Sequence, residues 1–90
     1  MMKKYNVELS DDAKKALKKM DRRQANIIVS WIEKNLDGCD NPRQHGKPLT
    51  GNKKGYWRYR VGAYRIIADI QDNIIQIEVV NVGHRRKIYD

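Results

Sequence analysis

Residues that build common catalytic and structural sites are scarce in this sequence. Cys39 is the single cysteine among 90 residues, which excludes a disulfide within the chain and a metal site made of several cysteines. The two histidines, His45 and His84, have no further histidine or cysteine at ligand spacing, so we expect no metal site. A lone thiol suits the reducing cytosol, and we therefore expect a cytoplasmic protein.

Long apolar runs are also missing. The chain starts with the basic residues of a signal peptide, Met1 to Asn6, but the apolar segment that should follow them is absent. No later stretch approaches the ~20 apolar residues of a membrane-spanning helix, so we expect no membrane partner. Hydrophobic residues at 40% and charged residues at 33% predict an ordinary globular protein, in which residues 1–90 form a single domain.

Acidic residues are absent from a long central segment. Between Asn41 and Ala68 there is no Asp or Glu, and the whole chain has a net charge of +8. The cations of this segment are Arg43, Lys47, Lys53, Lys54, Arg58, Arg60 and Arg65. Such a segment attracts polyanions, of which nucleic acid is the commonest. A solvated, lysine-rich surface would have the same composition and is the alternative.

Hydrophobic periodicity predicts an α+β protein with the element order β-α-α-β-β-β. Residues 5–9 alternate as a strand does, and Ser10 and Asp21 are placed to cap two amphipathic helices, the second of which ends at Gly38. The two helices should form an antiparallel hairpin. Residues 39–55 are rich in Gly, Pro, Asn and Lys and are expected to form a long surface loop.

The last part of the chain predicts an antiparallel meander. Strands are expected at residues 57–61, 64–70 and 74–82, joined by tight links at Gly62-Ala63 and Asp72-Asn73. With the first strand they would make a twisted, mainly antiparallel four-stranded sheet that carries the helical hairpin on one face.

Alternation along the first strand of this meander predicts a cationic row on the uncovered face of the sheet. Trp57, Tyr59 and Val61 would face the core, and Tyr56, Arg58 and Arg60 would face the other side. Guanidinium groups stay protonated and grip two phosphate oxygens at once, so such a row suits a nucleic-acid backbone. Arginines on an exposed strand also serve to solubilise or protect a sheet edge, which is the alternative for this row.

A set of many fixed cations and few bases suits an anionic transition state. Cleavage of RNA without metal requires a 2′-hydroxyl aligned on its phosphate, positive charge on the phosphorane, and proton transfer at both ends. His84, next to Arg85, is a candidate proton carrier, and the alternative is a polar turn residue. Tyr89 belongs either to a terminal segment that docks on the domain or to a frayed terminus. The glycines within residues 46–55 precede a strand and not a helix, so we expect no ATP, NAD or other cofactor.

Three motifs lie in the second half of the chain, between His45 and Tyr89. They are His45-Gly46-Lys47-Pro48-Leu49 with Gly51, Gly55-Tyr56-Trp57-Arg58-Tyr59-Arg60-Val61-Gly62 with Tyr64-Arg65-Ile66-Ile67, and Val82-Gly83-His84-Arg85 with Ile88-Tyr89. In these motifs and in its element order the sequence resembles the RelE branch of the RelE/ParE toxin superfamily. The resemblance implies a RelE-like fold and a toxin of a type II toxin-antitoxin system. It further implies an endoribonuclease that cuts mRNA in the ribosomal A site and is restrained by an antitoxin.

The resemblance and the charge pattern give a set of candidate site residues. The catalytic candidates are Arg58, Arg65, His84, Arg85 and Tyr89. The candidates for binding the substrate are Lys47, Lys53, Lys54, Tyr56, Arg60, Arg86 and Lys87. By the family's pattern the arginines would hold and neutralise the phosphate, and the near-terminal tyrosine would orient the substrate. A family member carries Lys where Tyr56 and His84 stand, so the resemblance does not identify the general base.

Two other functions fit the same sequence. A ParE-like toxin resembles this fold but poisons gyrase by binding, and the presence of Arg65, Arg85 and Tyr89 argues against it. A basic module that binds nucleic acid without cutting it needs no more than alternating arginines and aromatic residues on a sheet. Cut transcripts would indicate the endoribonuclease, and broken DNA would indicate the gyrase poison. Binding of nucleic acid without either result would indicate the module that only binds.

Overall fold

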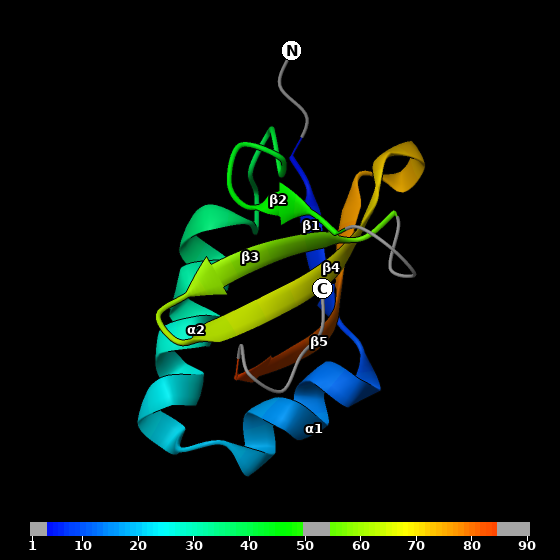
Figure 1. Cartoon of the computed structure of the whole chain (residues 1–90). Coiled ribbons are helices and arrows are strands. Elements are labelled where there is room, and N and C mark those ends of the chain that lie inside the picture. Colours follow the sequence, from blue (N-terminus) through cyan, green and yellow to red (C-terminus); the bar gives the residue numbers. More distant parts are fainter. Residues whose placement is uncertain (1–3, 50–54, 85–90) are drawn as a thin grey trace.

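The structure is a computed structural model that describes residues 4–49 and 55–84. Its elements are, in order, β1 (Asn6–Leu9), α1 (Asp11–Lys19), α2 (Arg22–Asn35), β2 (Lys47–Pro48), β3 (Trp57–Val61), β4 (Tyr64–Gln71), the 3₁₀ helix η2 (Asp72–Ile74) and β5 (Gln76–His84). The strands form one sheet in the order β1-β5-β4-β3-β2, in which β1 is parallel to β5 and all other neighbours are antiparallel. In Figure 1, α2 passes behind β3 and β4, and α1 lies beside β5. The predicted α+β architecture is confirmed.

The sheet has five strands and not the four that were expected. The additional strand is β2, which lies inside residues 39–55, the segment expected to be a loop. It pairs with β3 through Lys47 with Arg58 and Pro48 with Trp57. A two-residue strand has no alternation that a sequence can reveal, and its proline is tolerated because β2 is an edge strand. This short pairing holds the preceding chain against β3.

The connection between β4 and β5 also differs from the expected one. In place of a two-residue link at Asp72-Asn73, η2 is followed by Ile75 in the left-handed region at a φ of 53°. β5 therefore starts at Gln76 and ends at His84, two residues beyond the expected strand 74–82. The strand is thus shifted by two residues, because its bounds are set by tertiary pairing with β4, which the local sequence does not report.

Both helices begin where the sequence predicts. The Ser10 hydroxyl accepts the Ala13 N–H at 3.1 Å and donates to the Val80 carbonyl at 2.9 Å, so this cap also ties α1 to β5. Asp21 is the N-cap residue of α2 as predicted, but its side chain makes no capping hydrogen bond. Among the described residues, no helix has both the length and the apolarity to cross a membrane.

The core lies between the two helices and one face of the sheet. Its buried side chains are Tyr5, Ala13, Ile28, Ile32, Leu36, Tyr59, Ile66, Ala68, Ile77, Val79 and Val82. Along β3, Trp57, Tyr59 and Val61 face this core as predicted, and Arg58 and Arg60 alternate to the other face. Tyr59 is fully buried, and its hydroxyl donates to the Pro42 carbonyl at 2.6 Å.

Burial of Tyr59 makes the stability of the fold sensitive to alkaline pH. Burial raises the pKa of Tyr59, and a hydrogen bond to Asp72 raises the pKa of Tyr5. Above about pH 10, where an unfolded tyrosine ionises, the unfolded chain releases protons that the folded chain keeps. The stabilisation is therefore complete at lower pH and is lost as the pH rises above this value.

We expect Tyr59→Phe to flatten the alkaline decline in the free energy of unfolding, measured by urea titrations at several pH values from about 8 to 11. Tyr56→Phe, which removes a hydroxyl from an exposed ring, is the control and should keep the wild-type slope. Equal slopes for wild type and Tyr59→Phe would contradict this account.

Candidate nucleic-acid interface

A pocket lined by cations lies at the outer edge of β3. Its volume is about 440 Å³. The described residues that line it are Trp31, His45, Gly46, Lys47, Arg58, Arg60 and Arg65, and they include no Asp or Glu. Because β2 pairs only with the first two residues of β3, the pocket borders β3 where that pairing ends. We call it the cationic pocket.

The β3–β4 hairpin brings the three arginines of this pocket together. Gly62 has a φ of 60° in the two-residue link, which a type II′ turn requires, and the resulting register sets Arg60 opposite Arg65. Cross-strand partners share a face and lie about 5 Å apart, and Arg58 is two residues away on the same face. Like charges so close repel one another, and an anion bound between them removes that repulsion. The register therefore favours the binding of an anion between the arginines. Phosphate is a suitable anion, because each guanidinium group can donate to two of its oxygens.

The opposite wall of the cationic pocket is the chain that leads into β2. Trp57 Nε1 donates to the His45 carbonyl at 2.6 Å and so anchors this chain on β3. Gly46 has a φ of 79°, and a Cβ at that position would lie 2.8 Å from Trp57 Nε1 and 2.9 Å from Tyr59 Cδ1. Both the backbone conformation and the close approach require glycine.

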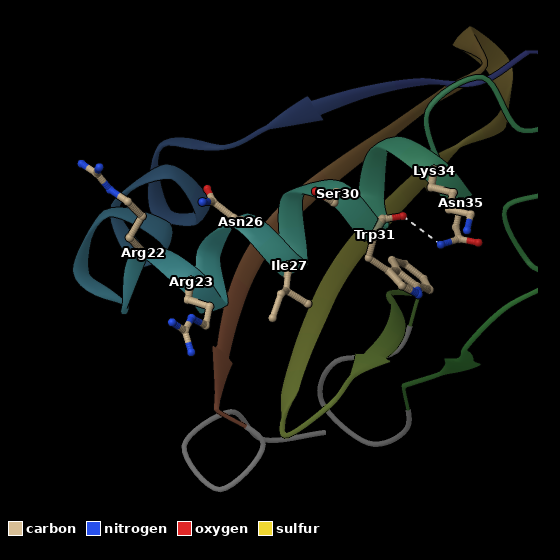
Figure 2. Close-up of a pocket in the computed structure, with 8 residues that line it drawn as sticks. All are labelled: Arg22, Arg23, Asn26, Ile27, Ser30, Trp31, Lys34 and Asn35. Atoms are coloured by element: carbon tan, nitrogen blue, oxygen red, sulfur yellow. Dashed lines mark hydrogen bonds between the residues drawn. The ribbon is translucent and has the colours of Figure 1, made fainter.

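Aromatic contacts position the His45 side chain at the cationic pocket. Its ring meets Trp31 edge-on, with centroids 5.8 Å apart at 69°, and Trp31 is tilted on Tyr59 at 5.5 Å. Figure 2 shows Trp31 projecting from α2 beside Asn35, whose amide donates to the Trp31 carbonyl at 3.0 Å. Charge pattern selects neither His45 nor Trp31 as a site residue. The available signal for His45 was its place in the first resemblance motif.

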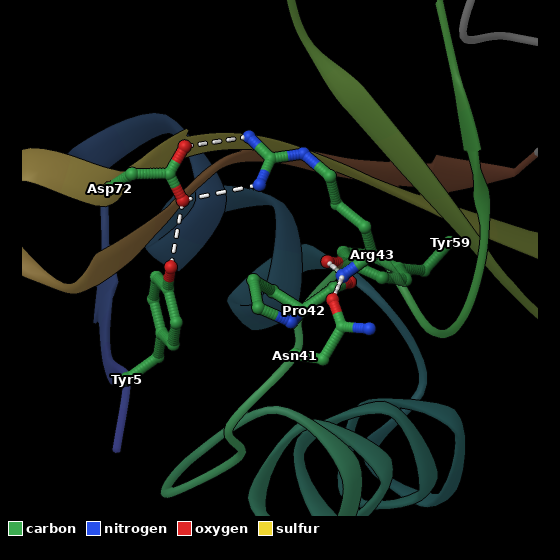
Figure 3. Close-up of polar contacts among 6 residues, drawn as sticks. All are labelled: Tyr5, Asn41, Pro42, Arg43, Tyr59 and Asp72. Atoms are coloured by element: carbon green, nitrogen blue, oxygen red, sulfur yellow. Dashed lines mark hydrogen bonds and ion pairs between the residues drawn. The ribbon is translucent and has the colours of Figure 1, made fainter. Parts of the chain in front are cut away.

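A polar cluster holds the same chain at a second point. Arg43 donates to both carboxylate oxygens of Asp72, at 3.1 and 2.9 Å, and the Tyr5 hydroxyl donates to one of them at 2.7 Å (Figure 3). The hydrogen bond to Asp72 raises the pKa of Arg43. Since the two charged side chains are 44% and 50% exposed, the ion pair serves to place the chain more than to stabilise the fold. Arg43 is thus committed to Asp72 and does not line the cationic pocket.

Four of the predicted site residues meet in the cationic pocket. They are Lys47, Arg58, Arg60 and Arg65. Tyr56 precedes β3, is 36% exposed, and is not among the lining residues. The other candidates, Lys53, Lys54, Arg85, Arg86, Lys87 and Tyr89, lie outside the described residues.

His84 is described, and it lies away from the cationic pocket. It is the cross-strand partner of Tyr64, and their rings meet edge-on with centroids 5.5 Å apart. Tyr64 packs against the core and is followed on β4 by Arg65, so Tyr64 and His84 face the side of the sheet opposite to the arginine. The structure therefore does not bring His84 to the residues that would hold a phosphate.

The fold is that of a family of small toxins. Residues 7–89 match the model of the family described as the ParE toxin of type II toxin-antitoxin systems, parDE. Because the match covers most of the chain, the protein belongs to this family and is a toxin of the type II class.

Sequence relatives place the chain in the RelE branch of the superfamily. Toxin RelE of Mycobacterium tuberculosis is 27% identical over 85 residues, which cover 94% of this chain and 86% of that toxin. A putative RelE-like toxin protein of Escherichia coli is 31% identical over 85 residues, which cover 93% and 86%. The resemblance inferred from the three motifs is confirmed.

Solved structures agree with this placement. A chain of the toxin-antitoxin complex RelBE2 from M. tuberculosis superimposes with a TM-score of 0.84 at 28% identity, covering 94% of this chain and 95% of that one. The archaeal RelE-RelB complex from Pyrococcus horikoshii gives a TM-score of 0.70 at 20% identity, covering 94% and 99%. At the lower identity the likeness shows the fold alone.

Proposed function

We propose that this toxin is a ribosome-dependent, metal-independent endoribonuclease that cuts mRNA and thereby stops translation. The observation that supports the proposal best is the meeting of Arg58, Arg60 and Arg65 with Lys47 in one pocket. A phosphate of the RNA backbone bound there would be surrounded by charges that persist near neutral pH. Donors already in place for the extra negative charge of a phosphorane stabilise it more than they stabilise the ground state.

The proposed reaction is attack by a 2′-hydroxyl on the adjacent phosphodiester. The 2′ oxygen forms a bond to phosphorus, and the bond from phosphorus to the 5′ oxygen of the next nucleotide breaks, leaving a cyclic phosphate and a 5′-hydroxyl. The fixed cations would neutralise the phosphorane. Within residues 4–49 and 55–84 no group of three or more His, Cys, Asp or Glu side chains could hold a metal ion for the same task. The ribosome would align the strand, and Arg85 and Tyr89 are proposed to complete the site.

An antitoxin partner is part of the proposal. The related chains from M. tuberculosis and P. horikoshii were solved in toxin-antitoxin and RelE-RelB complexes. We propose that an antitoxin with an acidic or amphipathic segment restrains this toxin, since a net charge of +8 favours an acidic partner. The proposed target places the toxin in the cytoplasm, where ribosomes translate.

The test is primer extension on a reporter mRNA from cells in which the toxin is induced. We expect new 5′ ends within the translated region, and none in a matched transcript whose start codon has been removed. Plasmid supercoiling is followed in the same cultures, because the ParE name of the matching family makes gyrase poisoning the second candidate. Intact transcripts with broken DNA would favour gyrase. Intact transcripts with intact DNA would leave a module that only binds nucleic acid.

A further inference from the structure

The cationic pocket, as lined by the described residues, holds one group that can accept a proton near neutral pH. Arginine and lysine keep their protons there, and the indole N–H of Trp31 is a donor only. The remaining side chain is the imidazole of His45, a type of group that changes protonation in this range. Cleavage by a 2′-hydroxyl requires such an acceptor in addition to positive charge.

We propose that His45 is the general base of the cationic pocket, an inference that rests on the proposed function. Before any RNA binds, one contact positions the imidazole and two contacts fix the backbone that carries it. Its own carbonyl is anchored by Trp57 Nε1 at 2.6 Å, its ring rests edge-on against Trp31 at 5.8 Å, and the next residue, Gly46, abuts β3. A base fixed in this way loses little freedom when substrate arrives.

The second histidine does not compete for this role. His84 packs on Tyr64 at the opposite face of the sheet, whereas His45 lines the same pocket as Arg58, Arg60 and Arg65. A general base must come within hydrogen-bond reach of the proton that it removes while the cations hold the phosphate. His45 meets the positional part of this condition, because it lines the pocket whose cations would hold the phosphate.

In the proposed step an imidazole nitrogen of His45 accepts the proton of the 2′-hydroxyl as the 2′ oxygen bonds to phosphorus. The bond from phosphorus to the 5′ oxygen breaks, and the leaving oxygen takes a proton from water. The hydroxide so formed removes the proton from the imidazolium, which returns His45 to its starting state.

The experiment compares wild type with His45→Phe and His45→Gln in cleavage of mRNA on programmed ribosomes at saturating toxin. His45→Phe keeps a ring against Trp31 but has no proton acceptor, and His45→Gln keeps a polar side chain. We expect each to cut about 100-fold more slowly and to lose the rise in rate with pH between about 5.5 and 8. Co-sedimentation with ribosomes and the melting temperature should stay at wild-type values. Added imidazole should restore part of the activity of His45→Ala.

Wild-type rates and an unchanged pH profile in both variants would overturn the role of His45 and leave the proposed function intact. A greater loss in His84→Gln than in His45→Gln would do the same. Loss of ribosome binding in parallel with loss of cleavage would reduce His45 to a structural part of the pocket. A wild-type protein that leaves translated mRNA intact would instead overturn the proposed function, and the role of His45 with it.

Discussion

Arg65→Ala is expected to lower the rate of mRNA cleavage on programmed ribosomes by roughly 100- to 1000-fold, the usual loss when one donor to a developing anion is removed. Arg65 lines the cationic pocket directly opposite Arg60, and it projects from β4, which is paired on both sides. Its backbone is therefore held on both sides, whereas Arg60 is paired with β4 alone. Arg65→Lys keeps the charge but not the two-pronged geometry, and we expect an intermediate rate. Single-turnover cleavage with excess toxin measures both variants.

The matched control for Arg65 is Arg22→Ala, which removes the same charge from an exposed position. Arg22 is the first residue of α2 and precedes Trp31 by nine positions, or about 14 Å of helix. Its loss should change the cleavage rate by less than about twofold, as expected for a charge outside the pocket. Equal losses in the two variants would mean that net charge alone matters. A wild-type rate in Arg65→Ala would mean that the cationic pocket is not where the phosphate binds.

Gly46→Ala is expected to destabilise the protein by about 3 kcal/mol, the sum of left-handed backbone strain and overpacking. The new Cβ would clash with the Arg58 carbonyl oxygen and press on Trp57 and Tyr59. The chain must then move away from β3, which separates one wall of the cationic pocket from the other. We expect a melting temperature lower by roughly 15 °C together with a loss of mRNA cleavage. Differential scanning calorimetry and the ribosome assay test the two effects.

Gly38→Ala is the control that separates the cost of backbone strain from the cost of overpacking in Gly46→Ala. Gly38 has a φ of 82°, close to the 79° of Gly46, but a Cβ there would have no atom within 4 Å. The substitution should therefore cost about 1 kcal/mol, for the backbone alone, and leave cleavage unchanged. Similar melting temperatures for the two variants would show that Gly46 does not lie tightly against β3.

Local patterns predicted those parts of the fold whose cause is local. Ser10 marks the start of α1 because its side chain bonds to the helix that follows it. The bounds of β3 and the faces of its residues follow from alternation over 57–61, which a half-buried strand imposes. The sequence also contains the information that brings Arg58 and Arg60 close to Arg65, because a two-residue turn sets the register of the hairpin.

Other features have causes that are distant in sequence. β2 exists because its two residues meet β3, and the left-handed Ile75 at the end of η2 has no local signal of the kind that glycine or asparagine gives. The positions of the two histidines relative to the cationic pocket also depend on contacts that are distant in sequence. His45 precedes a strand too short to predict, and the face on which His84 lies depends on its register with Tyr64.

The sequence by itself determined the composition of this toxin's surface, its two helices, its meander and its place in the RelE branch, because charge, periodicity and motif are properties of neighbouring residues. Tertiary structure decided which of those charges share a pocket, because the pairing of β2 with β3 and of β3 with β4 joins segments that are remote along the chain. Side-chain direction alternates along a strand, so a single step in register decides whether a histidine meets the arginines or the core.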